Sequence, residues 1–95
     1  MHKEIKLIYL KKPSKFLKKN LHIVKEEDVD ALIILGIRKK IFLENVSLDI
    51  KELKGNLHDK YRIRKGKIRI IFTIKEGDVI IESIIEDIDF RGNIY

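Results

Sequence analysis

Apolar residues recur along this chain at two different spacings, which predict strands at both ends and helices between them. Residues 4–10 alternate in character and place Ile5, Leu7 and Tyr9 on one face. Successive side chains of a strand point to opposite faces, so this segment is predicted as a first strand. Pro13 follows it, and we expect the strand to end there because proline cannot donate a hydrogen bond to a sheet.

Two helices are predicted in the next part of the chain. The first runs from an N-cap at Ser14 to about Leu21. The second runs from Glu26 to about Glu44, and its first residues are acidic, which suits the positive N-terminal end of a helix. Its packing stripe consists of Val29, Leu32, Ile33, Gly36, Ile37 and Ile41.

The second half of the chain predicts three antiparallel strands. Residues 45–59 are interpreted as a connector with a turn at residues 53–55, and the last strand is expected over residues 78–86. The two turns between the strands are placed at Lys65-Gly66 and Glu76-Gly77. The resulting order of strand, helix, helix and three strands predicts a single α+β domain over residues 1–95.

These turn positions also predict how the strands pair. Arg64 then faces Lys67, and Arg62 faces Arg69. One face of the hairpin carries these four cations, and the other carries Tyr61, Ile63, Ile68, Ile70 and Phe72.

The second turn extends this sheet. It places Phe72 opposite Ile81 and Ile74 opposite Val79, with Glu86 across from Lys67. Glu86 is interpreted either as the partner in a cross-strand charge pair or as a carboxylate that accepts a proton beside a phosphate site.

The charge balance favours a polyanionic partner. The chain has 21 Lys and Arg against 15 Asp and Glu, and a formal net charge of +6. Only five of the cations are arginines, and three of these fall within eight residues of the hairpin. Because a guanidinium binds phosphate through two parallel hydrogen bonds, their concentration there indicates a phosphate site.

Other classes of protein are disfavoured by the composition. The chain has no cysteine, so a disulfide framework and a thiolate metal site are excluded. The three histidines show no ligand spacing, and we expect neither a metal nor another cofactor. No apolar run approaches the length of a membrane span, and the first residues do not resemble a signal peptide, so we expect a cytoplasmic protein without a membrane partner.

A set of short motifs in the second half resembles the RelE/ParE superfamily of toxin–antitoxin toxins. The family pattern is roughly LKG, YRIRxGxYRIIY and a terminal HRxxxY. The matching segments here are 53–55, 61–64 with Gly66, 68–72, and the C-terminal segment 90–95.

The resemblance implies a compact toxin domain in which an N-terminal strand and a pair of helices pack on a twisted antiparallel sheet. In RelE-like members it also implies a ribosome-dependent endoribonuclease that cuts mRNA. Such cleavage uses the 2′-hydroxyl of the RNA, leaves a cyclic phosphate and needs no metal. The implied partners are a RelB-like antitoxin in a toxin–antitoxin hetero-oligomer, the ribosome and mRNA. The implied catalytic residues are Arg62, Arg64, Arg69, Arg91 and Tyr95, and the implied RNA-binding residues are Lys60, Lys67 and Phe90.

Two positions depart from the family pattern. The usual His or Lys before the C-terminal arginine is Phe90, and the tyrosine after the second hairpin strand is Phe72. Phe90 removes a candidate general acid or base, and Glu86, His58 and Lys67 are the possible substitutes. Phe90 itself either stacks on a base or serves as a core residue or antitoxin contact.

Two alternatives therefore remain open beside the mRNA nuclease. One is a ParE-like toxin that acts on DNA gyrase through protein contacts. The other is a catalytically impaired RelE-like binding protein, which is suggested by Phe90 in place of the usual His or Lys.

Overall fold

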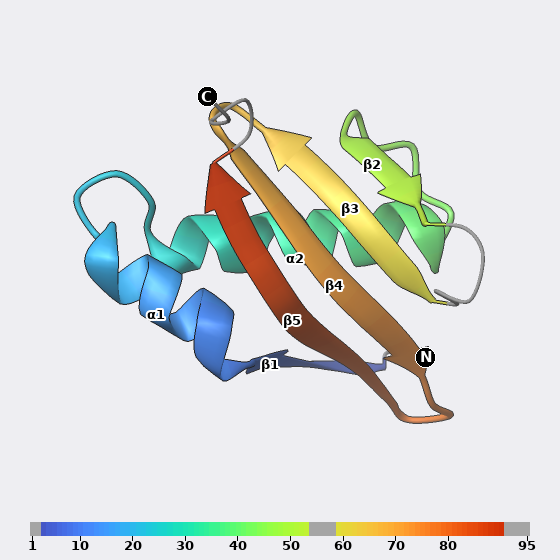
Figure 1. Cartoon of the computed structure of the whole chain (residues 1–95). Coiled ribbons are helices and arrows are strands. Elements are labelled where there is room, and N and C mark those ends of the chain that lie inside the picture. The colour runs from blue at the N-terminus through green and yellow to red at the C-terminus, as the bar shows by residue number, and fades with distance from the viewer. Residues whose placement is uncertain (1–2, 54–58, 91–95) are drawn as a thin grey trace.

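The computed structural model of the chain describes residues 3–53 and 59–90 (Figure 1). Two helices pack with a mixed sheet of five strands in the order β1-β5-β4-β3-β2, and this confirms the predicted α+β class. The elements in chain order are β1 (Glu4–Tyr9), α1 (Lys11–Lys19), α2 (Glu26–Lys40), β2 (Asp49–Glu52), β3 (Lys60–Lys65), β4 (Ile68–Glu76) and β5 (Ile80–Phe90).

Helix α2 crosses one face of the sheet and builds the core there (Figure 1). Its residues Val29, Ile33 and Ile37 are fully buried, as the predicted stripe requires. Gly36 brings the helix backbone close to the sheet, because a Cβ atom at this position would lie 3.0 Å from Ile50 Cδ1. The opposite face of the sheet, which we call the outer face, is turned toward the viewer in Figure 1.

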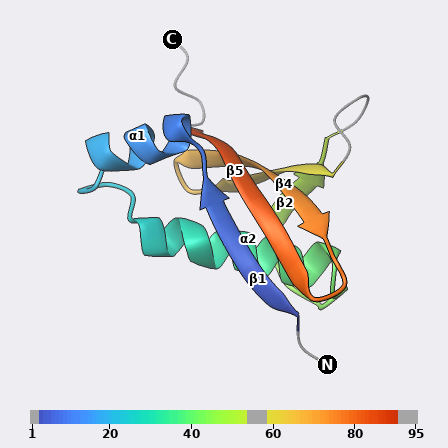
Figure 2. The same cartoon turned by 90° about the horizontal axis from the view of Figure 1, so that it is seen from below.

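Strand β1 lies beside the C-terminal strand rather than beside its neighbours in sequence. It pairs with β5 in parallel, from Glu4 opposite Ile80 to Tyr9 opposite Ile85 (Figure 2). The Tyr9 hydroxyl donates a hydrogen bond of 2.5 Å to Asp30 Oδ1 on α2. Burial, together with this bond and the charge of Asp30, raises the pKa of Tyr9 far above its ordinary value. This bond ties an edge strand to the central helix.

Both helices differ from prediction at their ends. Helix α1 begins at Lys11 with Leu10 as its N-cap, so Ser14 is not the cap and Leu21 lies beyond the helix. Pro13 falls in the first turn, where the amide hydrogen that proline lacks has no partner within the helix. Helix α2 ends at Lys40 rather than near Glu44.

Strand β2 was not predicted, because residues 49–52 were interpreted as part of a connector. It is short and mostly exposed, but it pairs antiparallel with β3, with Asp49 opposite Arg64 and Lys51 opposite Arg62. Ile50 packs against the core between these two polar residues. The predicted turn at residues 53–55 extends outside the described residues.

The pairing of both hairpins also differs from prediction. Lys65 pairs with Ile68, so the first turn consists of Gly66 and Lys67, and Gly66 has a positive φ of 58°. Such a φ is favourable for glycine and strained for lysine, which explains why the turn lies one residue further along. The predicted pairs of Arg64 with Lys67 and of Arg62 with Arg69 are therefore wrong.

The second hairpin has a longer loop and an irregularity. Glu76 pairs with Ile81 and Phe72 pairs with Ile85, so the predicted partners of Phe72 and Ile74 are wrong. A register shift between Ile71 and Phe72 leaves Glu86 as an extra residue on β5. Strand β5 also continues to Phe90, four residues beyond its predicted end. Among the described helices, none is long and apolar enough to cross a membrane.

Candidate nucleic-acid interface

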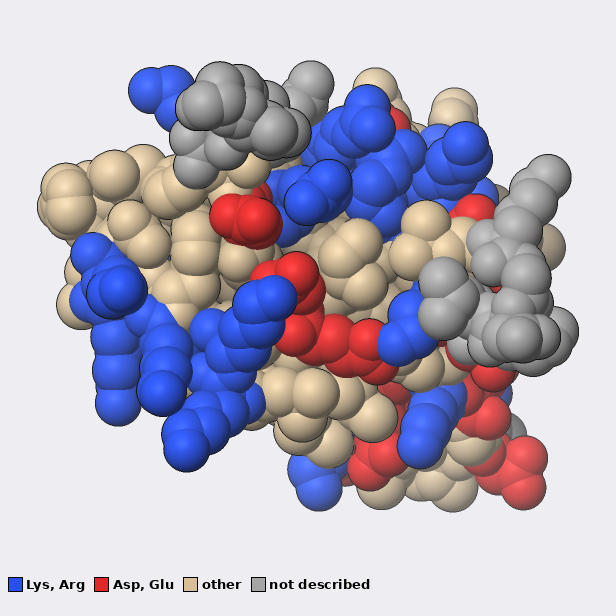
Figure 3. Space-filling view, in the orientation of Figure 1, with Lys and Arg blue, Asp and Glu red and all other residues tan. Residues whose placement is uncertain are grey.

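Three arginines of the first hairpin project from the outer face of the sheet. Arg62 and Arg64 alternate along β3 with the buried residues Tyr61 and Ile63. Arg69 of β4 is the direct partner of Arg64 in the ladder. Because paired residues share a face, Arg62, Arg64 and Arg69 form one cationic surface, called here the arginine face. Figure 3 shows Lys and Arg side chains gathered over this end of the sheet.

Arg62 is the most buried member of the arginine face. Only 12% of its side chain is exposed, and its Nη1 lies 3.7 Å from Asp49 Oδ1, which is too long for a hydrogen bond. This Nη1 is buried without a hydrogen-bond partner among the described residues. Asp49 thus compensates part of the charge of Arg62 as an ion-pair partner, but the buried Nη1 still lacks a hydrogen-bond acceptor, and an anion bound at the arginine face would supply one.

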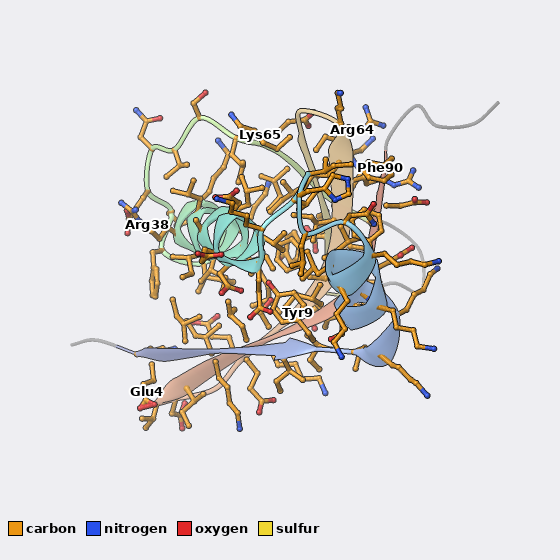
Figure 4. All side chains as sticks on the ribbon, turned by 90° about the vertical axis from the view of Figure 1, so that its left-hand side faces the viewer. Glu4, Tyr9, Arg38, Arg64, Lys65 and Phe90 are labelled. Atoms are coloured by element: carbon orange, nitrogen blue, oxygen red, sulfur yellow. The ribbon has the colours of Figure 1, made fainter. Side chains whose placement is uncertain are left out.

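Arg64 lies between two open depressions of the surface. One, of about 400 Å³, is lined by Lys51, Glu52, Leu53, Arg62 and Arg64. The other, of about 350 Å³, is lined by residues 47–49 and 64–66. No carboxylate within the described segments lies within ion-pair distance of Arg64. Its guanidinium therefore faces solvent at the tip of the hairpin, where Figure 4 shows it near Lys65.

Arg69 is half-exposed and has a weak partner. Its Nη2 lies 4.0 Å from Asp89 Oδ2, and the two side chains are 42% and 55% exposed. Ion pairs of this kind contribute about 0–1 kcal/mol. Asp89 therefore does little to prevent Arg69 from binding an anion.

Lys60, one of the predicted RNA-binding residues, already has a partner within the protein. Its Nζ donates to Glu86 Oε1, and Thr73 Oγ1 donates to Glu86 Oε2 over 2.7 Å. Burial raises the pKa of Glu86, but the two hydrogen bonds and the charge of Lys60 outweigh it, and the net pKa is lowered. The predicted position of Glu86 across from Lys67 is wrong, although the interpretation as a charge pair holds with Lys60 as the partner.

The remaining predicted residues are spread over different surroundings. Lys67 is exposed in the turn between β3 and β4. Phe90 packs on Phe16 of α1 with ring centroids 5.0 Å apart, which favours its interpretation as a core residue over that as a base-stacking residue. Arg91, Tyr95 and the candidate proton carrier His58 lie outside the described residues.

Two residues beside the arginine face were missed by sequence reasoning. Lys51 and Asp49 come from β2, and their register with β3 places them next to Arg62 and Arg64. The sequence indicates this strand only by the polar–apolar alternation of Asp49, Ile50 and Lys51. Three residues are too few to predict a strand from alternation. Over the described ranges, no group of three or more His, Asp or Glu residues is arranged to hold a metal ion.

Comparisons with known proteins identify the fold. No protein-family profile and no curated protein match the sequence. A copper-bound mutant toxin from Helicobacter pylori matches with 22% identity and a TM-score of 0.63, over 95% of this chain and 98% of that one. A YoeB/ParE toxin from Agrobacterium tumefaciens matches with 14% identity and a TM-score of 0.61, over 90% and 98%. The archaeal RelE–RelB complex from Pyrococcus horikoshii OT3 contains a chain with 24% identity and a TM-score of 0.55, over 99% and 100%.

The chain has the RelE-like fold. This confirms the fold that the sequence motifs implied. The RelE-like fold is shared by toxins that are nearly the same length as this chain, since the three matches cover almost all of each solved chain. Fold alone does not fix an activity.

Proposed function

We propose that this protein is the toxin of a toxin–antitoxin pair and acts as a ribosome-dependent mRNA endoribonuclease. The observation that carries the proposal is the arginine face, where three guanidinium groups meet on a side of the sheet that α2 does not cover. Its Arg62 Nη1 has no acceptor among the described residues. A phosphate of RNA supplies the acceptors that such a surface requires.

The proposed reaction exchanges one P–O bond for another. The 2′-oxygen of the substrate bonds to phosphorus and loses its proton, while the bond from phosphorus to the 5′-oxygen breaks and that oxygen gains a proton. Negative charge builds up on the non-bridging oxygens as phosphorus becomes five-coordinate. Arg64 and Arg69 stabilise that charge, and Arg62 anchors the phosphate from its more buried position. Electrostatic stabilisation of this kind is usually the largest contribution to catalysis.

Further residues complete the proposed site. By their resemblance to the family pattern, Arg91 adds a fourth guanidinium and Tyr95 orients the substrate. Lys67 and Lys51, which lie beside the arginine face, extend contacts along the RNA backbone. Lys60 contributes indirectly, since its ammonium group is held by Glu86.

The proposed partners are the ribosome, mRNA and a RelB-like antitoxin, in the cytoplasm. The structural match from Pyrococcus horikoshii was solved as a RelE–RelB complex, which supports an antitoxin partner. An antitoxin that covers the arginine face with carboxylates inhibits the toxin by occupying the phosphate site.

The test is inducible expression in bacteria with mapping of transcript ends. The native protein is expected to arrest growth and to produce new mRNA ends within translated regions. Arg64→Ala and Arg69→Ala abolish both effects, whereas the matched control Arg38→Ala retains them because Arg38 pairs with Glu44 at the end of α2. Cleavage at the native level by both site variants would refute the proposal.

A catalytically impaired RNA-binding protein is the second candidate. It is favoured by Phe90, which packs on Phe16 and replaces a proton-transfer group of the family pattern. Under this alternative the native protein binds ribosomes without producing new transcript ends. A ParE-like toxin is distinguished by inhibition of gyrase supercoiling in the absence of any mRNA cleavage.

A further inference from the structure

A second cationic surface lies on α1, away from the arginine face. Its five lysines are Lys11, Lys12, Lys15, Lys18 and Lys19, and all five are exposed. At 3.6 residues per turn these positions fall within an arc of about 120°. Pro13 and Leu17 on the other side of the helix are buried. The five residues therefore form one stripe, called here the lysine stripe.

The lysine stripe is held in a fixed place on the protein. Leu17 belongs to the hydrophobic core, and Phe16 packs on Phe90 of β5. The backbone of Leu10 donates a hydrogen bond of 3.1 Å to Ile85 at the start of the helix. The helix thus presents its lysines from a rigid support.

Two lysines of the stripe, Lys11 and Lys12, lie where the helix disfavours cations, whereas Lys18 and Lys19 lie in the last turn, where the helix dipole favours them. Helix α2 has three acidic residues in its first turn and three basic residues in its last turn, as the helix dipole favours. Helix α1 has no acidic residue in its first turn, and Lys11 and Lys12 occupy it instead. Like charges three and four residues apart add repulsion. A residue pattern that opposes local stability indicates a function outside the helix.

Little acidic charge within the protein compensates for the stripe. Residues 5–25 contain seven lysines and no Asp or Glu. Among the described residues, Lys12 alone in the stripe has an ion-pair partner, Asp87 at 3.3 Å, and the Lys12 side chain remains 76% exposed. An external polyanion therefore complements this surface.

Acidic side chains separate the two cationic surfaces. Figure 3 shows Lys and Arg side chains gathered over α1 and again over the end of the sheet that carries the arginine face, with red acidic atoms between the two groups. The acidic residues of β5 are Glu82, Glu86, Asp87 and Asp89. One strand of RNA that ran from one surface to the other would meet these carboxylates, so the two surfaces suit two different segments.

We propose that the lysine stripe binds the phosphate backbone of double-helical RNA, while the arginine face holds the substrate strand. The stripe spans about 12 Å along the helix axis. Over that length a duplex presents roughly seven phosphate charges, enough for one at each of the five lysines, whereas one strand presents only about half as many. The inference rests on the proposed function for the identity of the polyanion as RNA, and it gives the protein a contact with structured RNA of the ribosome.

The test compares two double variants that remove the same charge. Lys15→Gln with Lys18→Gln alters the stripe, and Lys25→Gln with Lys75→Gln alters two exposed lysines elsewhere. Gln and Lys have similar helix propensities, so the stripe variant is expected to keep its circular dichroism and its melting temperature. Binding to a labelled RNA duplex of about 16 base pairs is measured between about 50 and 200 mM salt.

In the stripe variant, affinity is expected to depend less steeply on salt. The magnitude of the negative slope of log affinity against log salt should fall by about 1.5 to 2, since each lost phosphate contact removes about 0.9. The control variant leaves the slope within about 0.5 of the native value. Equal losses in both variants, or an unchanged slope in the stripe variant, would overturn the inference. So would a stripe variant that loses binding to polyglutamate or to phosphatidylserine vesicles but keeps its binding to the duplex.

The duplex assay is independent of mRNA cleavage. If duplex binding depends on the stripe while no transcript is cleaved, the proposed nuclease fails and the RNA contact stands. If transcripts are cleaved and the stripe has no effect on duplex binding, the opposite conclusion follows.

Discussion

The contact between Lys60 and Glu86 joins β3 to the irregular part of β5, and its strength is predictable from its surroundings. Both side chains are 26% exposed, which is intermediate between a surface pair and a buried one. Exposed pairs contribute about 0.2–1 kcal/mol, and hydrogen bonds to charged groups about 1.5–3 kcal/mol. We expect a coupling free energy of about 1–2 kcal/mol between the two residues.

The assay is a double-mutant cycle with Lys60→Met, Glu86→Gln and the combined variant. The free energy of unfolding is measured by urea denaturation, followed by circular dichroism at pH 7. A coupling free energy within about 0.4 kcal/mol of zero would refute the reasoning. Substitutions at two residues that do not interact have additive effects on stability to within about that margin. It would mean that solvent screens this pair as it screens a fully exposed one.

The same contact predicts a pH dependence with a definite sign. The pKa of Glu86 is lowered below its ordinary value of 4.5, so the folded protein favours the ionised carboxylate. The stabilisation is therefore complete above pH 4.5 and is lost as the pH falls through the folded pKa. The stability difference between the native protein and Glu86→Gln should shrink below pH 4.5. A difference that stayed constant down to pH 3 would contradict this.

Three further substitutions test the fold. Gly36→Leu should destabilise by about 2 kcal/mol in urea denaturation, because even a Cβ atom would lie 3.0 Å from Ile50 Cδ1; no loss would mean that α2 packs less closely. Tyr9→Phe should cost about 2 kcal/mol by removing the hydrogen bond to Asp30, and an unchanged melting temperature would argue against that bond. Gly66→Ala should lower the free energy of unfolding by about 1 kcal/mol. Nothing lies within 4 Å of an added Cβ atom, so this cost comes from the φ of 58° alone, and Gly66→Asn should cost less because asparagine tolerates such a φ better.

The faces of the sheet could be predicted from sequence, whereas the pairings could not. Alternation along β3 and β4 correctly separated the buried residues, such as Ile63 and Ile70, from the arginines. The first turn lies one residue further along than predicted, which changes each partner by two positions. A shift by two keeps every side chain on the same face. The prediction that Arg62, Arg64 and Arg69 share one face is therefore correct, although the predicted partners of Arg62 and Arg64 are wrong.

Features that depend on tertiary contacts were beyond the sequence pattern. The segment of β2 has four residues, of which Ile50 alone is apolar, and it forms a strand because β3 offers an open edge. The partner of Glu86 depended on the irregularity of β5, which the sequence does not mark. The start of α1 was misplaced because Pro13 was taken as a break, although a helix accepts proline in its first turn.

The most direct test of the central claim is the rate of mRNA cleavage on purified ribosomes in a single turnover. We expect the native protein to cleave, Arg64→Ala and Arg69→Ala to cleave about 10²- to 10³-fold more slowly, and Arg38→Ala to cleave at the native rate. The new end is expected to carry a 2′,3′-cyclic phosphate. A native protein that does not cleave, or arginine-face variants that cleave within about twofold of the native rate, would contradict the assignment of the arginine face as the phosphate site.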